Sequence, residues 1–294
     1  MKEKFKDINF GVRTLEIINK ANEIVEDYQQ QGFELTLRQL YYQFVSKALI
    51  ENTERSYKNL GSIINDGRLA GMIDWEAIED RTRHLRGNQH WNTPGEIARA
   101  CAHSFYKDHW ANQDFRIEVW VEKEALAGVA ESACRPLDIP FFCCKGYTSQ
   151  SEMYNAAQRL VRYDNEGKKA VIIHLGDHDP SGIDMSRDIE DRIKMFTYNQ
   201  DFEFRRIALN QNQILEYNPP PNPAKMTDSR FIEYRKKFGD QSWELDALPP
   251  QVLASLIKNT VYEYRDPDNW GEVEAEQEKG KGKLIAMAAK IDKK

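Results

Sequence analysis

The chain has 294 residues, of which 40% are hydrophobic and 30% charged, the composition of a soluble globular protein with room for two domains of ordinary size. No apolar run approaches the roughly 20 residues that cross a bilayer, and the first ten residues lack the apolar core of a signal peptide, so no membrane association and a cytoplasmic location are expected. The net charge of −6 argues weakly against a nucleic-acid partner without excluding one, because charge can be segregated between faces.

The first part of the chain is predicted to be helical. Residues 11–31 place apolar side chains near helical spacing, and Gly32 is a typical C-terminal stop, so an amphipathic helix is expected there. Thr36 and Gln39 have the spacing of a capping box, which predicts that a second helix begins at Leu37. Local signals therefore define the end of one helix and the start of the next.

A polar turn, "ENTERS", and a third helical segment at residues 57–73 follow, and then comes the basic run "RTRHLR" at residues 81–86. Helices with short connections before a basic stretch favour a helix-turn-helix domain of the winged type over residues 1–92. A basic run is usually a solvated face, but its position after such a domain also favours contact with DNA phosphates. Both interpretations stay open at this point.

The pattern changes between residues 93 and 210, where strands and helices alternate. Thr93 and Glu96 have capping-box spacing with Pro94 at the first helical position, ahead of a helix that would bridge two domains. Strands are predicted at residues 115–121, 139–145, 169–175 and 202–209, with helical segments between them. This alternation predicts the α/β fold class, with a parallel sheet covered on both faces.

The last part of the chain, residues 211–294, is less regular and is expected to complete or pack on the α/β domain. Residues 217–229, "YNPPPNPAKMTDS", are proline-rich and predicted to form neither helix nor strand. Residues 243–264 resume a helical pattern. The charged tail, residues 272–294, is helix-permissive and expected to be solvated or partly ordered.

The stretch "AVIIHLGDHDPSGIDM" ends a predicted buried strand with Asp177 and Asp179, one residue apart. One interpretation is turn chemistry, because Asp, Pro, Ser and Gly are the residues that close a strand and open a helix. The other is that both carboxylates bind a hard divalent cation such as Mg²⁺, which prefers oxygen ligands. A short D-x-D occurs often by chance, so this stretch alone does not decide between them.

An earlier predicted strand also ends in acids, with Glu122 directly after it and Glu124 two residues later. In open parallel sheets, ligands bind outside the carboxyl ends of the strands. If the two strands are neighbours, Glu122 meets Asp177 and Asp179 at one edge of the sheet. Glu124 is interpreted as a secondary or surface acid, and Lys123 either contacts phosphate or points to solvent.

Histidines and cysteines contribute little to the predicted site. Neutral imidazole suits zinc better than magnesium, so His174 is interpreted as strand packing and His178 as a neighbour of the site whose role stays open. The cysteines have no C-x-x-C spacing and are expected to be buried thiols in a reducing compartment, without a metal. They are Cys101, Cys134, Cys143 and Cys144.

The pairing of "VEKEALAG" with "GDHDPSGID" resembles the Toprim domain, a metal-binding α/β module shared by topoisomerases, bacterial primases and some nucleases. The resemblance implies a Rossmann-like parallel sheet and assigns the Mg²⁺ ligands to Glu122, Asp177 and Asp179. Gly182 fits the close turn into the following helix. The combination in its strand contexts is far more specific than a D-x-D alone.

Upstream, "LTLRQLYYQF" resembles the helix that bears the nucleophilic tyrosine in the A subunit of topoisomerase VI and in the related meiotic double-strand-break protein. Carried over, the motif residues are Arg38, Tyr41 and Tyr42, with Tyr42 as the nucleophile. The resemblance, which "KGYTSQSEMYNAAQRL" extends, covers roughly residues 35–200. It implies a winged-helix, CAP-like N-terminal domain followed by the Toprim domain, as in the compact stand-alone form called Mini-A.

The resemblance implies a type IIB topoisomerase activity on double-stranded DNA, with Mg²⁺ and a 5′-phosphotyrosyl intermediate. A homodimer is expected, in which the tyrosine of one subunit meets the metal of the other, and a separate ATPase partner is compatible with the absence of an ATPase region. The chain is shorter than a full A subunit, and its last 80 or so residues match less clearly. Whether strands are passed, or only cut and resealed, therefore stays open.

The chemistry of the tyrosine has its own requirements and alternatives. A phenol with a pKa near 10 needs stabilisation of its phenolate or of the transition state, and Arg38, four residues from Tyr42 on a predicted helix, lies on the same face. A tyrosine pair on a helix usually buries at least one ring, so Tyr42 could merely pack. The alternatives are then a Toprim hydrolytic nuclease without a covalent intermediate, or a DNA-binding regulator with a vestigial metal site, against which the intact acidic trio speaks.

Overall fold

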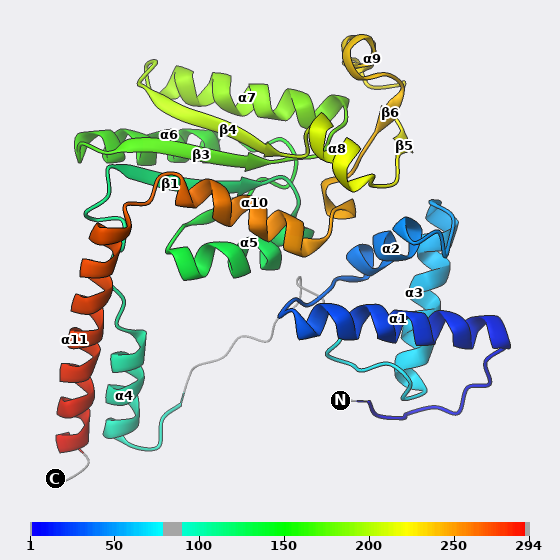
Figure 1. Cartoon of the computed structure of the whole chain (residues 1–294), viewed down its shortest axis with the longest axis horizontal. Coiled ribbons are helices and arrows are strands. Elements are labelled where there is room, and N and C mark those ends of the chain that lie inside the picture. Colours follow the sequence, from blue (N-terminus) through cyan, green and yellow to red (C-terminus); the bar gives the residue numbers. More distant parts are fainter. Residues whose placement is uncertain (1, 79–89, 292–294) are drawn as a thin grey trace.

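The computed structural model describes residues 2–78 and 90–291 (Figure 1). The basic run at residues 81–86 lies outside the described residues. The fold is mixed α/β, with a four-stranded parallel sheet, as expected from the alternating pattern. No helix among the described residues is long and apolar enough to cross a membrane.

Three helices occupy residues 2–78: α1 (Val12–Gln30), α2 (Leu37–Ser46) and α3 (Glu54–Leu69). The predicted capping box is confirmed, because the side chain of Thr36 accepts from the backbone N–H of Gln39, and the Gln39 side chain accepts from Thr36 N at 2.9 Å. The polar turn is shorter than predicted, because the Thr53 side chain caps α3 and starts it at Glu54. The β-structure within residues 2–78 consists of isolated bridges, such as that between Leu35 and Ile78.

These three helices enclose a core of their own. Ile18 of α1, Leu40 and Phe44 of α2 and Leu60 of α3 are almost completely buried in it. Ala247, from far down the chain, belongs to the same cluster and brings the C-terminal part against α2. The helical segment is therefore packed against a distant part of the chain as well as being connected to it in sequence.

The sheet is built from β1 (Phe115–Val121), β2 (Phe141–Cys143), β3 (Lys169–Leu175) and β4 (Phe202–Ala208), in the order β2-β1-β3-β4. All neighbouring pairs are parallel, and Val121 lies opposite Leu175 where β1 and β3 end. The crossover helices are α5 (Ala127–Cys134), α6 (Gln150–Asn165) and α7 (Pro180–Phe196). The predicted parallel sheet is confirmed.

Helices cover both faces of this sheet (Figure 1). Trp120 and Ile172 pack with residues of α6 and α7 on one face. Val119 and Ile173 point to the other face, where α5 and a helix from the C-terminal part of the chain, α10 (Pro250–Tyr262), lie. Successive strand residues thus alternate between two apolar clusters, as a fully buried sheet requires.

The C-terminal part contains more regular structure than the sequence predicts. Its elements are α8 (Gln211–Tyr217), β5 (Asn222–Pro223), α9 (Phe231–Phe238), β6 (Gln241–Ser242), the short 3-10 turn η3 (Leu245–Ala247), α10 and α11 (Pro267–Ile291). The expectation that residues 217–229 form neither helix nor strand is wrong at three residues, because Tyr217 ends α8 and the two residues of β5 pair antiparallel with β6. The proline lies in a two-residue edge strand, where a missing N–H is tolerated.

The charged tail is also more ordered than predicted. Helix α11 packs against α4 (Pro94–Ser104), away from the sheet (Figure 1). Trp270, Val273 and Ala288 are buried along it, so an apolar stripe lies within a strongly charged segment. This region is helical, as its helix-permissive composition predicts, and most of its side chains are exposed, but a continuous helix that packs on α4 is more order than was expected.

Candidate functional site

The carboxyl ends of β1 and β3 bring Glu122 and Asp177 together. The backbone N–H of Asp177 donates to Oε2 of Glu122 at 2.7 Å, and the N–H of Glu122 donates to the carbonyl of Leu175 at 2.9 Å. Only 9% of Glu122 and 7% of Asp177 is exposed. Because the strands are adjacent and parallel, their ends place both acids at one edge of the sheet, as the sequence predicts.

Asp179 also performs the turn chemistry that was the simpler interpretation. Its Oδ1 accepts from the backbone N–H of Gly182 at 2.6 Å and so caps α7, with Pro180 in the first turn. A Cβ on Gly182 would lie 2.3 Å from the carbonyl oxygen of Asp177 and 3.1 Å from Oε2 of Glu122. The close turn therefore requires glycine, and it holds α7 against both acids.

Burial and mutual repulsion dominate the electrostatics of these acids. Burial raises the pKa of Glu122, and the charge of Asp179 adds to the effect. Burial also raises the pKa of Asp177, with further contributions from Glu122 and Glu244 that Lys123 opposes. Raised pKa values at neighbouring carboxylates mean that a bound cation would relieve both desolvation and repulsion.

The donor set fits a hard cation in its chemistry, because Glu122, Asp177 and Asp179 offer carboxylate oxygens to the metals that prefer them. The geometry is not that of a closed ligand cage. Oδ1 of Asp177 accepts from the backbone N–H of Leu245 at 2.7 Å and lies 3.0 Å from Nζ of Lys123. Within residues 2–78 and 90–291, no group of three or more His, Cys, Asp or Glu side chains is arranged to hold a metal ion.

Lys123 connects the sheet edge to a second pair of acids. Its ammonium group pairs with Glu244, with Asp246 at 2.9 Å and with Asp177 at 3.0 Å. Burial alone would lower the pKa of Lys123, but these carboxylates raise it, so the side chain stays charged. The alternative that Lys123 points to solvent is therefore wrong, since only 18% of its side chain is exposed.

Arg38 binds the same pair of acids. Its Nε donates to Oδ2 of Asp246 at 2.8 Å, and a terminal nitrogen donates to Oε2 of Glu244 at 2.8 Å. The same terminal nitrogen lies 3.5 Å from the hydroxyl of Tyr42, and the guanidinium lies 5.7 Å from the centre of that ring. Arg38 and Tyr42 share one face of α2, as their spacing predicts.

The two tyrosines of α2 differ in how their hydroxyl groups are used. Both rings are buried, at 5% and 4% exposed. The hydroxyl of Tyr41 donates to Oδ1 of Asn52 at 2.9 Å and to the carbonyl of Thr53 at 3.2 Å. The hydroxyl of Tyr42 instead lies beside Arg38. Tyr41 therefore has a structural hydrogen-bonding role, and Tyr42 is the one whose oxygen adjoins the charged network.

Tyr42 is protonated in this arrangement. Burial raises its pKa, and the charges of Asp246 and Glu244 raise it further, whereas Arg38 and Lys123 oppose the shift. Formation of a phenolate would therefore require either a nearby cation or removal of a negative charge. Of the two acids, the side chain of Asp246 is completely buried, whereas that of Glu244 is 29% exposed.

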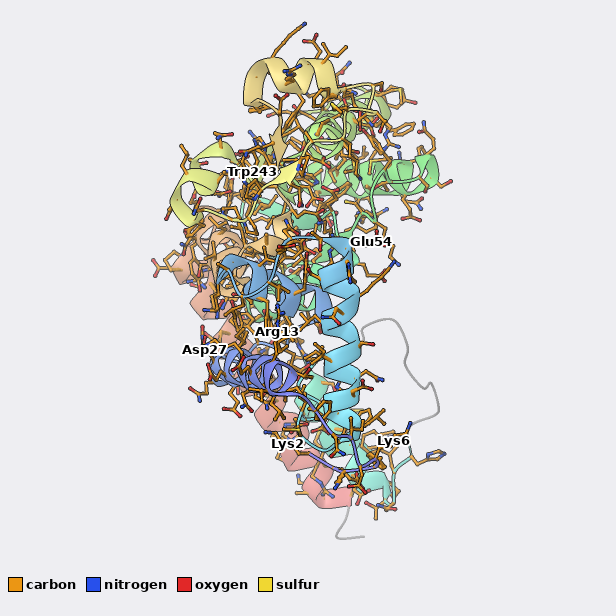
Figure 2. All side chains as sticks on the ribbon, turned by 90° about the vertical axis from the view of Figure 1, so that its right-hand side faces the viewer. Lys2, Lys6, Arg13, Asp27, Glu54 and Trp243 are labelled. Carbon is orange, nitrogen blue, oxygen red and sulfur yellow. The ribbon has the colours of Figure 1, made fainter. Side chains whose placement is uncertain are left out.

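A cavity of about 280 Å³ borders Arg38, Tyr42 and Glu244. Its other lining residues are aromatic, hydroxyl-bearing, amide or acidic: Tyr41, Asn52, Thr53, Glu54, Tyr57 and Asn222. In Figure 2, the end of α3 that begins at Glu54 points toward the part of the molecule that holds Trp243, and Lys2 and Lys6 lie at its other end. The cavity thus lies where the helical segment meets the C-terminal part.

Sequence reasoning missed Glu244 and Asp246, which were assigned only to a helical pattern. They lie before and within η3, in the stretch "SWELDALPP". The available signal was an E-x-D in an otherwise apolar run, which repeats the spacing of Asp177 and Asp179. Their partners could not be predicted from that signal, because Arg38 and Lys123 lie more than a hundred residues away.

Arg206 was also missed, within a segment assigned only as a strand. Its guanidinium donates to the carbonyls of Gly176 at 2.9 Å and Asp177 at 2.7 Å, and to that of Gly182 at 3.1 Å. Burial lowers the pKa of Arg206 to about 10, although Glu122 and other nearby acids oppose the shift. Arg206 thus fixes the backbone on both sides of the two aspartates.

The remaining predicted neighbours have structural roles. His174 is buried and stacks on Phe204, which confirms strand packing. Nδ1 of His178 lies 2.8 Å from the Tyr234 hydroxyl, so the ring belongs to an aromatic cluster. Glu124 pairs with Lys145 at 2.8 Å and is half exposed, as expected for a surface acid.

The predicted burial of the cysteines holds for some of them only. Cys134 and Cys144 are buried, Cys143 is intermediate, and Cys101 is exposed. None of these four cysteines forms a disulfide. The expectation of burial is therefore wrong for Cys101, which lies on α4 outside the sheet.

Comparisons of the chain with protein-family models, with curated proteins and with solved structures gave no match.

Proposed function

We propose that this chain cleaves and rejoins double-stranded DNA by transesterification, with Tyr42 as nucleophile and Mg²⁺ bound by Glu122, Asp177 and Asp179. The observation that carries the proposal is the shared pair of carboxylates between Arg38 and Lys123. Through it, the helix with the tyrosine and the sheet edge with the acids meet in one charged network. A tyrosine nucleophile and a metal site must converge to act on one phosphate, within one subunit or between the subunits of a dimer.

The proposed reaction exchanges one phosphoester bond, between phosphorus and the 3′ oxygen, for another, between phosphorus and the tyrosine oxygen. The oxygen of Tyr42 attacks the scissile phosphorus and loses its proton to solvent, while the bond to the 3′ oxygen breaks and that oxygen gains a proton. Arg38 binds the phosphate and favours the phenolate. A bound metal would neutralise negative charge on the phosphate and on the leaving 3′ oxygen. Because the 5′-phosphotyrosyl bond resembles the bond that was broken, the reverse reaction reseals the strand.

The proposed assembly is a homodimer that presents two tyrosines to the two strands. The helices at residues 2–78 serve in the proposal as a winged-helix DNA-binding domain, and the parallel sheet as a Toprim domain. In the dimer of the resembled family, the tyrosine acts on the phosphate at the partner's metal. The contact between Arg38 and Asp246 within one chain also permits the two halves of one subunit to act together.

A covalent-adduct assay tests this proposal. Linear duplex DNA, labelled at a 5′ or 3′ end, is incubated with the protein and Mg²⁺ and denatured with detergent. We expect label that enters the gel only after proteolysis, and its loss in Tyr42→Phe. The matched control is Tyr41→Phe, which removes the neighbouring hydroxyl and should retain the adduct. Loss in Tyr41→Phe with retention in Tyr42→Phe would contradict the assignment.

A hydrolytic nuclease at the same acids is the second candidate. The observation in its favour is the burial of Tyr42, which raises the pKa of its hydroxyl and suits a packing role. In that case the acids position a water molecule in place of the tyrosine. Cuts without protein-linked ends, equal in wild type and Tyr42→Phe, would select this candidate.

A further inference from the structure

Glu244 lies where two cations from different parts of the chain meet. Its carboxylate accepts from Arg38 of α2 at 2.8 Å and pairs with the ammonium of Lys123, which follows β1. It also borders the cavity that contains Tyr42. One partly exposed carboxylate thus occupies the anion-binding position between an arginine and a lysine, beside the proposed nucleophile.

Asp246 binds the same two cations but differs from Glu244 in exposure. Its Oδ2 accepts from Nε of Arg38 and its Oδ1 accepts from Lys123, and its side chain is completely buried. Arg38 therefore uses different nitrogens for the two acids. Departure of Glu244 would leave Arg38 and Lys123 bound to Asp246, and Arg38, which lines the cavity, would lack one of its two acceptors.

A phosphate group is the natural competitor for this position. Carboxylate and phosphate oxygens both take charge-assisted hydrogen bonds from arginine and lysine, and phosphate offers more acceptor oxygens. Within the described part of the chain, the side chain of Glu244 is 29% exposed, whereas that of Asp246 is completely buried. An incoming phosphate could replace Glu244 without passing through the protein interior.

We propose that Glu244 is an internal substitute for a DNA backbone phosphate, which DNA displaces from Arg38 and Lys123 while Asp246 keeps both cations in place. The inference rests on the proposed function, since it takes DNA as the ligand. Glu244 would then compete with DNA and weaken its binding, because only protein molecules in which Glu244 has left Arg38 and Lys123 can bind the phosphate there.

DNA binding without cleavage tests the inference. The probe is a fluorescein-labelled duplex, measured by anisotropy with EDTA in place of Mg²⁺ and with Tyr42→Phe as the parent, so that no covalent step contributes. Glu244→Gln is expected to bind about five-fold more tightly than the parent at about 0.1 M salt. Adding Arg38→Gln should abolish that gain, because the released donor is then missing.

The matched control is Glu54→Gln, which removes the same charge at the same cavity. Glu54 pairs with Lys58 and not with Arg38 or Lys123, so we expect a gain below about two-fold from the general change in charge. Equal gains in Glu54→Gln and Glu244→Gln would overturn the inference, as would unchanged or weaker binding by Glu244→Gln. Glu244→Ala should reproduce the gain, and failure of both Glu244 variants to fold would show a structural role instead.

The DNA-binding experiment and the covalent-adduct assay distinguish failure of this inference from failure of the proposed function. If Glu244→Gln tightens DNA binding and the wild type never forms an adduct, transesterification fails and the binding inference stands. If the wild type forms the adduct and Glu244→Gln binds no more tightly than its parent, only the inference fails. Absence of DNA binding by every variant would overturn it too.

Discussion

Nε of Arg38 donates to Oδ2 of Asp246 at 2.8 Å, although 208 residues separate them along the chain. The bond joins α2 to η3, and Asp246 also binds Lys123 at the end of β1. A buried carboxylate therefore helps to fix the position of Tyr42 relative to the acids at the sheet edge. Asp246 acts as a positioning residue for both cations.

Asp246→Asn is expected to destabilise the protein much more than Glu244→Gln. Removing the buried charge leaves Arg38 and Lys123 without their enclosed partner, which we expect to cost about 2–4 kcal/mol of unfolding free energy. Glu244, whose side chain is partly exposed, should contribute less than about 1 kcal/mol. Urea denaturation measures both values, and equal losses in the two variants would contradict the assigned roles.

Glu118 provides a test of a buried acid that the proposed chemistry does not use. Its carboxylate accepts from Nε and a terminal nitrogen of Arg159 at 2.8 Å each, and from the indole of Trp120 at 3.0 Å. Glu118→Gln should lose about 2–4 kcal/mol of stability, because a buried charged pair is broken. Adduct formation per folded molecule should be retained, and its loss would show that stability and chemistry are not separable on β1.

Glu122→Gln should behave in the opposite way. Burial already raises the pKa of Glu122, and the charge of Asp179 opposes its ionisation, so a neutral side chain relieves repulsion. We expect unfolding free energy without Mg²⁺ to be unchanged or higher by up to about 1 kcal/mol, and the adduct to be abolished. A stable variant with wild-type adduct yield would remove Glu122 from the proposed metal site.

The cysteines should differ sharply in reactivity. Burial raises the pKa of both Cys134 and Cys144 to about 12, whereas Cys101 is exposed on α4. Since the thiolate is the nucleophile, native protein treated with iodoacetamide at about pH 8 should be labelled at Cys101 and not at the two buried thiols. Peptide mapping by mass spectrometry measures the labelling. Rapid modification of Cys134 before denaturation would contradict the packing of α5 on the sheet.

His174 predicts a loss of stability in mild acid. Burial, with the charge of Arg206, lowers its pKa from 6.5 to about 3, so the unfolded chain binds a proton first as the pH falls. The stability contribution is complete above about pH 6.5 and is lost progressively toward pH 3. Between pH 6.5 and 5 the loss should be about 2 kcal/mol. Denaturant unfolding of His174→Asn should show a correspondingly smaller slope with pH, and an unchanged slope would contradict this.

Local signals were sufficient to predict most elements around the site. Thr36 and Gln39 form the capping box that starts α2, and the apolar runs of β1 and β3 place Glu122 and Asp177 at adjacent strand ends. The capping box depends on residues that are close in sequence, and the meeting of the two acids depends on the order of the strands. The side chain of Asp179 satisfies the turn interpretation directly.

The network around the tyrosine could not be predicted in the same way. The ion pairs of Glu244 and Asp246 join segments over a hundred residues apart, and such pairs leave no periodic pattern in the sequence. The packing of α11 was obscured for another reason, since many charged residues lie between its buried residues Val273 and Ala288. Long-range packing decided the arrangement in both cases.

Identification of the residue that carries the DNA tests the central claim most directly. The denatured adduct is digested with nuclease and trypsin, and the peptide that retains a nucleotide is fragmented in a mass spectrometer. Cleavage after Arg38 and Lys47 yields one peptide with both tyrosines, and the fragment series distinguishes them. We expect a phosphonucleotide on the oxygen of Tyr42. A nucleotide on Tyr41 or on another residue, or DNA cut without any modified peptide, would contradict it.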